Sequence, residues 1–237
     1  MSDFTVPSDL AGKEVVVLFS GGRDSTLVAC LLALKGIKLH LLTGNCGLGV
    51  GTEIVETRFQ ELSRKFSDNI VIWQTLDIKG LLGAIAFRNI EDDFREYHKN
   101  LILLGEKMAL HTEAVLYCLS LGIKYIADGT VKYQEHLAEQ TPEAVTFFRK
   151  FSEEYGIQYL TPIIGASSED QVKDSLFILG ISTKSLESIS LLSDSFSKPD
   201  EGVSALYLER KKPICTRYIA FRRGEISDFG RLARPDH

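Results

Sequence analysis

The sequence lacks the features that mark several large classes of protein. No apolar run approaches the ~18 residues that are needed to span a bilayer. The N-terminal residues Met-Ser-Asp-Phe-Thr-Val-Pro show no basic and apolar secretory pattern. We therefore expect a cytoplasmic protein that does not enter a membrane. Its cysteines form neither a Cys-x-x-Cys pair nor a zinc-ligand spacing, which predicts reduced thiols; they are Cys30, Cys46, Cys118 and Cys215.

The chain also lacks two signatures of nucleotide and nucleic-acid binding. It has no Gly-x-x-x-x-Gly-Lys-Ser/Thr motif, which argues against a Walker-type NTPase. Its formal net charge of −5 argues against a large nucleic-acid face, because phosphate binding needs concentrated Lys and Arg. The basic C-terminal stretch is the exception, and it fits either a solvated or subunit-packing segment or an RNA arm. Its cations are Arg210, Lys211, Lys212, Arg217, Arg222, Arg223, Arg231 and Arg234.

The most informative segment is an apolar run, a double glycine and a helical pattern in direct succession. Residues 15–19 are Val-Val-Val-Leu-Phe, typical of a strand buried on both faces of a parallel sheet. Gly21 and Gly22 permit a sharp turn that brings backbone N–H groups close to a ligand. Asp24 or Ser25 is expected to cap the following helix. This arrangement predicts a phosphate or pyrophosphate site, although a ligand-free strand–helix turn uses the same residues.

Residues 20–25, Ser-Gly-Gly-Arg-Asp-Ser, resemble the Ser-Gly-Gly-x-Asp-Ser signature of the PP-loop ATP pyrophosphatases. Members of this family cleave ATP between the α and β phosphates with Mg²⁺ and usually adenylate an acceptor. The resemblance is nearest to tRNA thiouridine synthetases, sacrificial sulfur transferases and 7-cyano-7-deazaguanine synthase. It implies that ATP and Mg²⁺ are cofactors and that Asp24 assists the metal or the turn. It also implies that the phosphates lie against Ser20, Gly21, Gly22, Arg23, Asp24, Ser25 and Thr26, and that Thr43 and Gly44 hold the adenine edge.

Strand-like and helix-like segments alternate along the chain, as in doubly wound α/β proteins. We therefore expect a Rossmann-like, doubly wound, five-stranded parallel sheet with helices on both faces. Residues 1–190 form the predicted nucleotide-binding domain, and residues 191–237 a C-terminal extension that is helical or irregular. Beyond the first strand and helix, strands are expected at 38–43, 70–76, 124–127 and 158–164, and helices at 53–66, 101–121 and 142–155.

A second motif, Asp128-Gly129-Thr130, follows the strand expected at 124–127. It resembles the family's second segment, which lies near the nucleotide and the acceptor. Ligands of such sheets bind beyond the carboxyl ends of the strands, so this motif and the glycine turn should meet at one edge. Three roles stay open for Asp128: it binds Mg²⁺, orients Lys132, or closes a turn of the kind typical of Asp-Gly.

A third segment, at residues 167–176, resembles the family's last conserved helix. Lys173 would supply a cation to the polyphosphate there, and a solvated helix position is the alternative. Glu169 stands where family members carry a lysine, and an acid there opposes polyphosphate binding. Ser167 or Ser168 with Gln171 also fits a capping box, which explains the start of this helix without any function.

The acceptor is the least determined part of the prediction. The thiouridine-synthetase cysteines are missing near Asn100, and Cys118 lies in an apolar helical pattern typical of a buried residue. Cys46 follows the second strand near the nucleotide, and Cys215 has neighbouring cations that should lower its pKa. We predict an enzyme that adenylates a tRNA base or a small-molecule acceptor for sulfur or nitrogen transfer. A nucleotide-binding sensor of the universal-stress-protein type is the alternative, and the sequence is compatible with a homodimer. The candidate catalytic residues are Asp24, Lys173, Asp128, Cys46 and Cys215, with Asp24 and Asp128 as candidate metal ligands.

Overall fold

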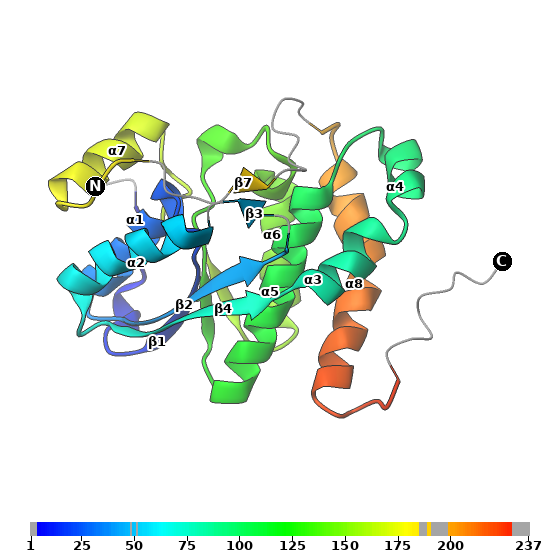
Figure 1. The fold of residues 1–237 in the computed structure, drawn as a ribbon, viewed down its shortest axis with the longest axis horizontal. Helices are drawn as coiled ribbons and strands as arrows, with labels where there is room; N and C mark the ends of the chain where they lie inside the picture. Colours follow the sequence, from blue (N-terminus) through cyan, green and yellow to red (C-terminus); the bar gives the residue numbers. More distant parts are fainter. Residues whose placement is uncertain (1–3, 48, 51, 185–188, 191–198, 229–237) are drawn as a thin grey trace.

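The computed structural model describes residues 4–47, 49–50, 52–184, 189–190 and 199–228, and a parallel sheet runs through its centre (Figure 1). The spatial order of the five strands is β4-β2-β1-β5-β6, and every neighbouring pair is parallel. The predicted Rossmann-like sheet is therefore confirmed. The strands are β1 (Glu14–Leu18), β2 (Lys38–Asn45), β4 (Ile70–Asp77), β5 (Tyr125–Ala127) and β6 (Gln158–Leu160).

Helices cover both faces of this sheet (Figure 1). Val15 and Val17 of β1 pack in one hydrophobic cluster with α1 (Arg23–Leu34), α2 (Thr52–Phe66) and α7 (Glu169–Ile178). Val16 and Leu18 point the other way, into a second cluster with α5 (Ile102–Leu121), α6 (Pro142–Glu153) and α8 (Val203–Arg222). Because side chains alternate along a strand, a strand covered on both faces must be apolar throughout.

Short elements occupy the remaining segments. The stretch after β4, which the sequence leaves irregular, forms two short helices separated by a π-helical turn. A two-stranded antiparallel ribbon joins residues far apart in the sequence. These elements are η1 (Ser8–Leu10), β3 (Gly49–Val50), α3 (Lys79–Leu82), η2 (Gly83–Phe87), α4 (Ile90–Tyr97), η3 (Lys132–Gln134), η4 (Ala138–Gln140) and β7 (Ile189–Ser190).

The described part of the C-terminal extension is mainly α8, which packs against α5 and α6. Tyr207, Leu208 and Cys215 of α8 belong to the same hydrophobic cluster as the sheet. The division of the chain at residue 190 into two domains stays a prediction. Among the described residues, no helix has the length and apolarity that crossing a membrane requires.

The strand order places a crevice at one edge of the sheet. The chain leaves β1 toward β2 on one side, and it later returns to place β5 on the other side. Loops after neighbouring strands that are wound in opposite directions diverge, and this leaves room for a ligand at the carboxyl edge. The glycine turn follows β1, and the Asp128 motif follows β5, so both lie at this edge.

Candidate functional site

The turn after β1 has the geometry of an anion site. Gly21 has a φ of 78°, a left-handed conformation that glycine adopts without steric cost. α1 begins at Arg23, and its N-cap residue Gly22 makes no side-chain capping hydrogen bond in the described structure. The expectation that Asp24 or Ser25 caps this helix is therefore wrong, because both lie inside its first turn. Without a side-chain cap, the first N–H groups of α1 and the positive end of its dipole are left for a ligand.

Hydroxyl groups brace this turn from within. Ser25 Oγ lies 3.1 Å from Ser20 Oγ, and Gly22 N–H donates to Ser20 Oγ at 3.2 Å. Thr26 Oγ1 donates to the Gly22 carbonyl at 2.6 Å. Ser25 and Thr26 are buried, so these bonds hold the turn in place before a ligand binds.

A pocket of about 390 Å³ opens beside the turn, between it, the ends of β2 and β5, and α5. Most of the predicted binding residues line this pocket. They are Ser20, Gly22, Arg23, Asp24, Ser25, Thr43, Gly44, Asp128, Gly129 and Thr130. The predicted residues outside the lining are Gly21, Thr26, Lys173, Cys46 and Cys215.

Gly129 explains why the two motifs meet. A Cβ atom on Gly129 would lie 2.6 Å from the backbone nitrogen of Ser25 and 2.8 Å from the carbonyl carbon of Asp24. Real Cβ atoms do not approach backbone so closely, and therefore only glycine lets this loop lie against the start of α1. The glycine that indicates a turn in the sequence thus also permits contact between the two motifs.

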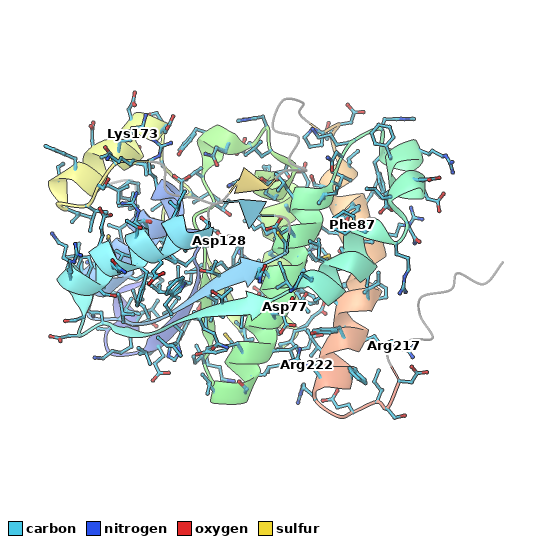
Figure 2. All side chains as sticks on the ribbon, in the orientation of Figure 1. Asp77, Phe87, Asp128, Lys173, Arg217 and Arg222 are labelled. Carbon is cyan, nitrogen blue, oxygen red and sulfur yellow. The ribbon has the colours of Figure 1, made fainter. Side chains whose placement is uncertain are left out.

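Asp128 (Figure 2) is buried in the pocket wall, and it forms an ion pair with Lys107 of α5. Lys107 Nζ lies 2.9 Å from Asp128 Oδ2, and the Tyr159 hydroxyl donates to the same oxygen. Thr130 N–H donates to Asp128 Oδ1 at 3.0 Å, so the aspartate also closes the predicted turn. Burial acts to raise the pKa of Asp128, but Lys107 and these hydrogen bonds outweigh it and lower that pKa below its ordinary value. The partner of Asp128 is therefore Lys107, and the exposed Lys132 is not in contact with it in the described structure.

Lys107 has no role in the prediction from the sequence, although the structure places it in the pocket wall. Its ammonium also donates to Thr130 Oγ1 at 2.9 Å and to the Glu139 carbonyl at 3.0 Å. A signal was present, because Glu106 and Lys107 interrupt the apolar pattern of residues 101–121. Charged residues inside such a pattern need partners or a function.

Glu106 forms another part of the wall and connects Cys46 to the pocket. Burial raises the pKa of Glu106, a hydrogen bond with Cys46 opposes this, and Glu139 adds to the rise. Cys46 is half-buried and lies outside the pocket lining. The thiol that the sequence places near the nucleotide is thus separated from the pocket by a carboxyl group.

The carboxylates differ in how well they suit Mg²⁺. This ion usually takes one or two protein carboxylates and completes its octahedron with phosphate oxygens and water. Asp24 lines the pocket and accepts the Tyr133 hydroxyl at 2.9 Å, so it fits that role. Asp128 fits poorly, because an ammonium already neutralises it. Across the described residues, no group of three or more His, Cys, Asp or Glu could hold a metal without a ligand's help.

Glu169 at the start of α7 neutralises two of the predicted cations. Arg23 Nη2 lies 2.5 Å from Glu169 Oε1, and Lys173 Nζ lies 3.2 Å from the same oxygen. Glu169 lines the pocket, whereas Lys173, also on α7 (Figure 2), is outside the lining. The predicted capping hydrogen bond is present, since Ser168 Oγ accepts from Gln171 N–H at 3.2 Å. The acid therefore holds Arg23 beside the pocket and partly cancels its charge.

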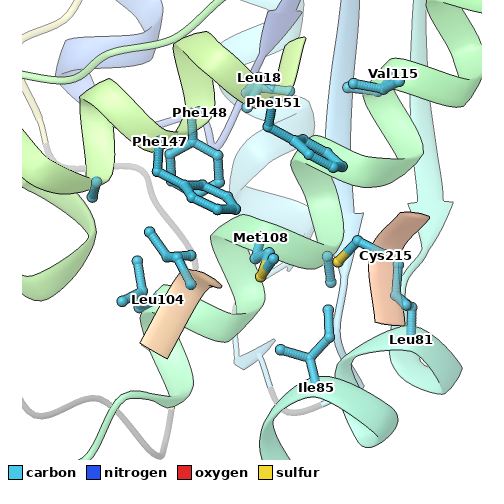
Figure 3. Close-up of a cluster of buried hydrophobic side chains, with 14 of the residues drawn as sticks. Leu18, Leu81, Ile85, Leu104, Met108, Val115, Phe147, Phe148, Phe151 and Cys215 are labelled. Atoms are coloured by element: carbon cyan, nitrogen blue, oxygen red, sulfur yellow. The ribbon is translucent and has the colours of Figure 1, made fainter. Parts of the chain in front are cut away.

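Cys215 lies in the hydrophobic core, apart from the pocket (Figure 3). Burial raises its pKa to about 12, so the expectation that neighbouring cations lower this pKa is wrong. Those cations point elsewhere, because Lys211 pairs with Asp93 and Lys212 pairs with Glu154. Cys118 is fully buried, as the sequence predicts, and burial raises its pKa to about 12.

The basic residues of α8 mostly pair within the chain. Lys211 Nζ lies 2.5 Å from Asp93 Oδ2, and Arg222 Nη1 lies 3.2 Å from Glu113 Oε1. Arg217 donates to the Asp228 carbonyl at 2.7 Å. This favours the packing interpretation of the stretch over an RNA arm. Arg231 and Arg234 lie outside the described residues.

Comparison with solved structures finds similar chains at low sequence identity, and at least one of them superposes well enough to show a shared fold. A 4-thiouridine synthetase in complex with RNA and bound ATP superposes with a TM-score of 0.59 and 19% identity over 88% of this chain. This chain spans about half, 53%, of that synthetase chain. A predicted subunit of a tRNA methyltransferase from Methanocaldococcus jannaschii gives a TM-score of 0.45, with 21% identity over 78% of this chain and 100% of that one. NMN synthetase from Francisella tularensis gives 0.47, with 14% identity over 95% of this chain and 85% of that one.

Sequence comparison assigns the chain to a family without assigning it an activity. No curated protein sequence matches it. The model of a family of unknown function, DUF7411, matches residues 13–188. That match includes the glycine turn, the Asp128 motif and α7. The chain therefore belongs to the DUF7411 family.

Proposed function

We propose that this protein is an ATP-dependent adenylating enzyme of the PP-loop ATP pyrophosphatase type, which converts ATP to AMP and pyrophosphate. One observation carries the proposal: the uncapped N-terminus of α1 and the buried Lys107–Asp128 pair face the same pocket. The helix N-terminus suits the phosphate groups, and Lys107 supplies a cation across from it. The fold shared with a 4-thiouridine synthetase supports the same assignment.

Different pocket residues have different roles in the proposed reaction. An oxygen or nitrogen of the acceptor attacks the α-phosphorus, the bond to the bridging oxygen breaks, and pyrophosphate leaves with the bonding electrons. A second nucleophile, or water, then attacks the adenylated acceptor, and AMP leaves with the electrons of the bond that joined it to the acceptor. The N–H groups at the start of α1 and Arg23 hold the departing pyrophosphate. Lys107 stabilises negative charge at the α-phosphate, and Thr43 with Gly44 lies against the adenine. Asp24, together with the phosphates, would hold Mg²⁺, which would supply positive charge to the leaving group.

The acceptor class is a tRNA base or a small molecule. No cysteine is among the lining residues in the described part of the chain, so we favour attack through nitrogen or oxygen. A sulfur transfer would need a sulfur donor other than a lining thiol, because Cys46 is outside the lining and hydrogen-bonds with Glu106. The ion pairs that occupy the cations of α8 favour a small acceptor over a long RNA.

The decisive experiment follows the α-phosphate. The protein is incubated with α-labelled ATP and Mg²⁺, alone and with total tRNA or a metabolite extract, and AMP is resolved from ADP. We expect AMP and pyrophosphate and no ADP. Asp24→Asn should abolish pyrophosphate release while the protein stays folded. Asp92→Asn, an exposed change on α4 that removes the same charge, should leave the rate unchanged.

Two outcomes would change the assignment. Bound ATP with no AMP formed, whatever acceptor is added, would favour the non-catalytic sensor. The neutralisation of Arg23 by Glu169 is the observation that keeps this alternative, since it weakens the charge available to a leaving group. Turnover that survives Asp24→Asn would instead overturn the role of that residue.

A further inference from the structure

Arg58 of α2 is the largest fully buried side chain in the described structure, and it lies directly behind the glycine turn. Its Nε donates to the Gly21 carbonyl at 3.4 Å. Nη1 and Nη2 donate at 2.6 Å to the carbonyls of Ser182 and Lys184, which follow α7. One guanidinium therefore joins three segments that are far apart in the sequence.

Glu61 is the counter-charge of this buried arginine. Arg58 Nη1 lies 2.6 Å from Glu61 Oε2, one turn further along α2. Burial lowers the pKa of Arg58, Glu61 opposes this, and the nearby Arg23 lowers it further. Two arginines thus bring positive charge to the same turn, one on the pocket side and one behind it. An anion bound at the turn would interact favourably with both charges.

The contact with Gly21 determines how the turn presents its donors. A peptide unit is planar and trans, so its C=O and the next N–H point in opposite directions. Arg58 holds the Gly21 carbonyl on the α2 side, and the Gly22 N–H of the same unit points to Ser20 Oγ, which lines the pocket. Glycine alone would not keep this orientation, because a double-glycine turn is the most flexible in a protein.

We propose that Arg58 is a positioning residue of the phosphate site, which fixes the Gly21–Gly22 peptide and, through the bond from its N–H group to Ser20 Oγ, the hydroxyl that lines the pocket. This inference rests on the proposed function. Arg58 does not line the pocket, and it acts through the turn. Its contacts with Ser182 and Lys184 anchor the guanidinium, and they tie the chain after α7 to the same turn.

The test separates phosphate binding from adenosine binding. Arg58→Lys, which keeps the charge but cannot reach three carbonyls at once, and Arg58→Met are compared with wild type by calorimetric titration of inorganic pyrophosphate, ATP and adenosine. We expect both variants to weaken pyrophosphate and ATP by about tenfold or more, because the donors are no longer held in place. Adenosine affinity should not change. Arg64→Met, an exposed change on the same helix, should bind all three as wild type does.

Each outcome supports or overturns the inference. Full recovery of pyrophosphate affinity in Arg58→Lys would show that charge alone matters, and an equal loss for adenosine would show a general structural role; either result overturns the proposal. If Arg58→Met does not fold, Arg58→Lys carries the comparison. If wild type binds neither ATP nor pyrophosphate, the proposed function fails. Hydrogen exchange at the Gly22 amide still tests the positioning role, which is overturned if Arg58→Lys leaves that rate unchanged.

Discussion

At the scale of single residues, the site depends on a few buried polar groups whose partners are distant in sequence. Lys107 and Asp128 are 12% and 7% exposed at their side chains, and each is the other's main counter-charge. A buried charge that loses its partner is strongly destabilising, whereas the intact pair is close to neutral. The pair therefore adds little net stability, and its position in the pocket wall fits a role in the site.

Replacing Lys107 should show how strongly Asp128 depends on its positive charge. In Lys107→Met, burial acts on Asp128 without its main opposing charge, so the pKa of Asp128 should rise. We expect a loss of about 3 kcal/mol in the free energy of unfolding at neutral pH. Urea unfolding measures it, with the exposed Lys132→Met as control. Adding Asp128→Asn to Lys107→Met should recover part of the loss, and no recovery would contradict the ion-pair explanation.

The Lys107–Asp128 pair should also affect how stability depends on pH. The pKa of Asp128 is lower in the folded protein than its ordinary value. Such a carboxyl contributes fully to the free energy of unfolding at a pH above its pKa in the unfolded chain, and this contribution is lost as the pH falls through its pKa in the folded protein. Wild type should therefore keep the contribution of Asp128 to more acidic pH than Lys107→Met does. Unfolding curves measured at a series of acidic pH values test this, and identical acid profiles would contradict it.

The role of a residue could be predicted from the sequence where the residues that act together are adjacent in the chain. It could not be predicted where the role depends on a partner from a distant segment. The Ser-Gly-Gly-Arg-Asp-Ser turn could be read from six adjacent residues. Cys215 could not, because the direction in which Lys211 and Lys212 point depends on the packing of α8. The role of Arg58 at the turn carries no local signal, since the backbone carbonyls that it binds are 37 and more residues away.

At the scale of elements, close approach between the loop after β5 and α1 shapes the pocket. Gly129→Ala would place a methyl group 2.6 Å from the Ser25 nitrogen, and backbone on both sides must move. We expect a loss of about 1–3 kcal/mol in the free energy of unfolding and weaker ATP binding. Gly80→Ala is the matched control, because an added Cβ there meets nothing within 4 Å. Equal stability of the two variants would show that the loop adjusts freely.

Element boundaries followed the sequence where the apolar pattern was strong. The strand predicted at 70–76 spans Ile70–Asp77, and the helix predicted at 53–66 spans Thr52–Phe66. The start of α1 was misjudged, because Ser25 and Thr26 use their hydroxyls inside the turn and leave Gly22 as N-cap. The π-helical turn at Gly83–Phe87 could not be foreseen, since its local sequence resembles any apolar helix.

At the scale of the whole molecule, the topology follows from the pattern of strands and helices. Alternation of these elements with right-handed crossovers leaves few arrangements, and the strand order β4-β2-β1-β5-β6 is one of them. What the pattern could not indicate is how the C-terminal segment attaches. α8 completes the hydrophobic cluster under α5 and α6, and its link to α4 is a buried ion pair.

The buried Lys211–Asp93 ion pair should contribute to the stability of the whole fold. Lys211 and Asp93 are 2% and 8% exposed, and Asp93 Oδ1 already has no hydrogen-bond partner in the described structure. Lys211→Met should therefore lower the free energy of unfolding by about 3 kcal/mol, because the buried Asp93 keeps only the more distant Arg210, at 3.8 Å, as its counter-charge. Lys212→Met removes an exposed ion pair from the same helix and should cost less than about 1 kcal/mol.

The way stability is lost also tests whether α8 is integral to the fold. If α8 and the sheet form one cooperative unit, Lys211→Met should still unfold in a single transition, with its midpoint at a lower urea concentration. Far-UV circular dichroism and the fluorescence of Trp73, which lies in β4, should follow the same transition. Asp93→Asn combined with Lys211→Met should regain most of the stability, since no buried charge remains. Two separate transitions would instead favour a C-terminal extension that folds apart from the part of the chain that forms the sheet.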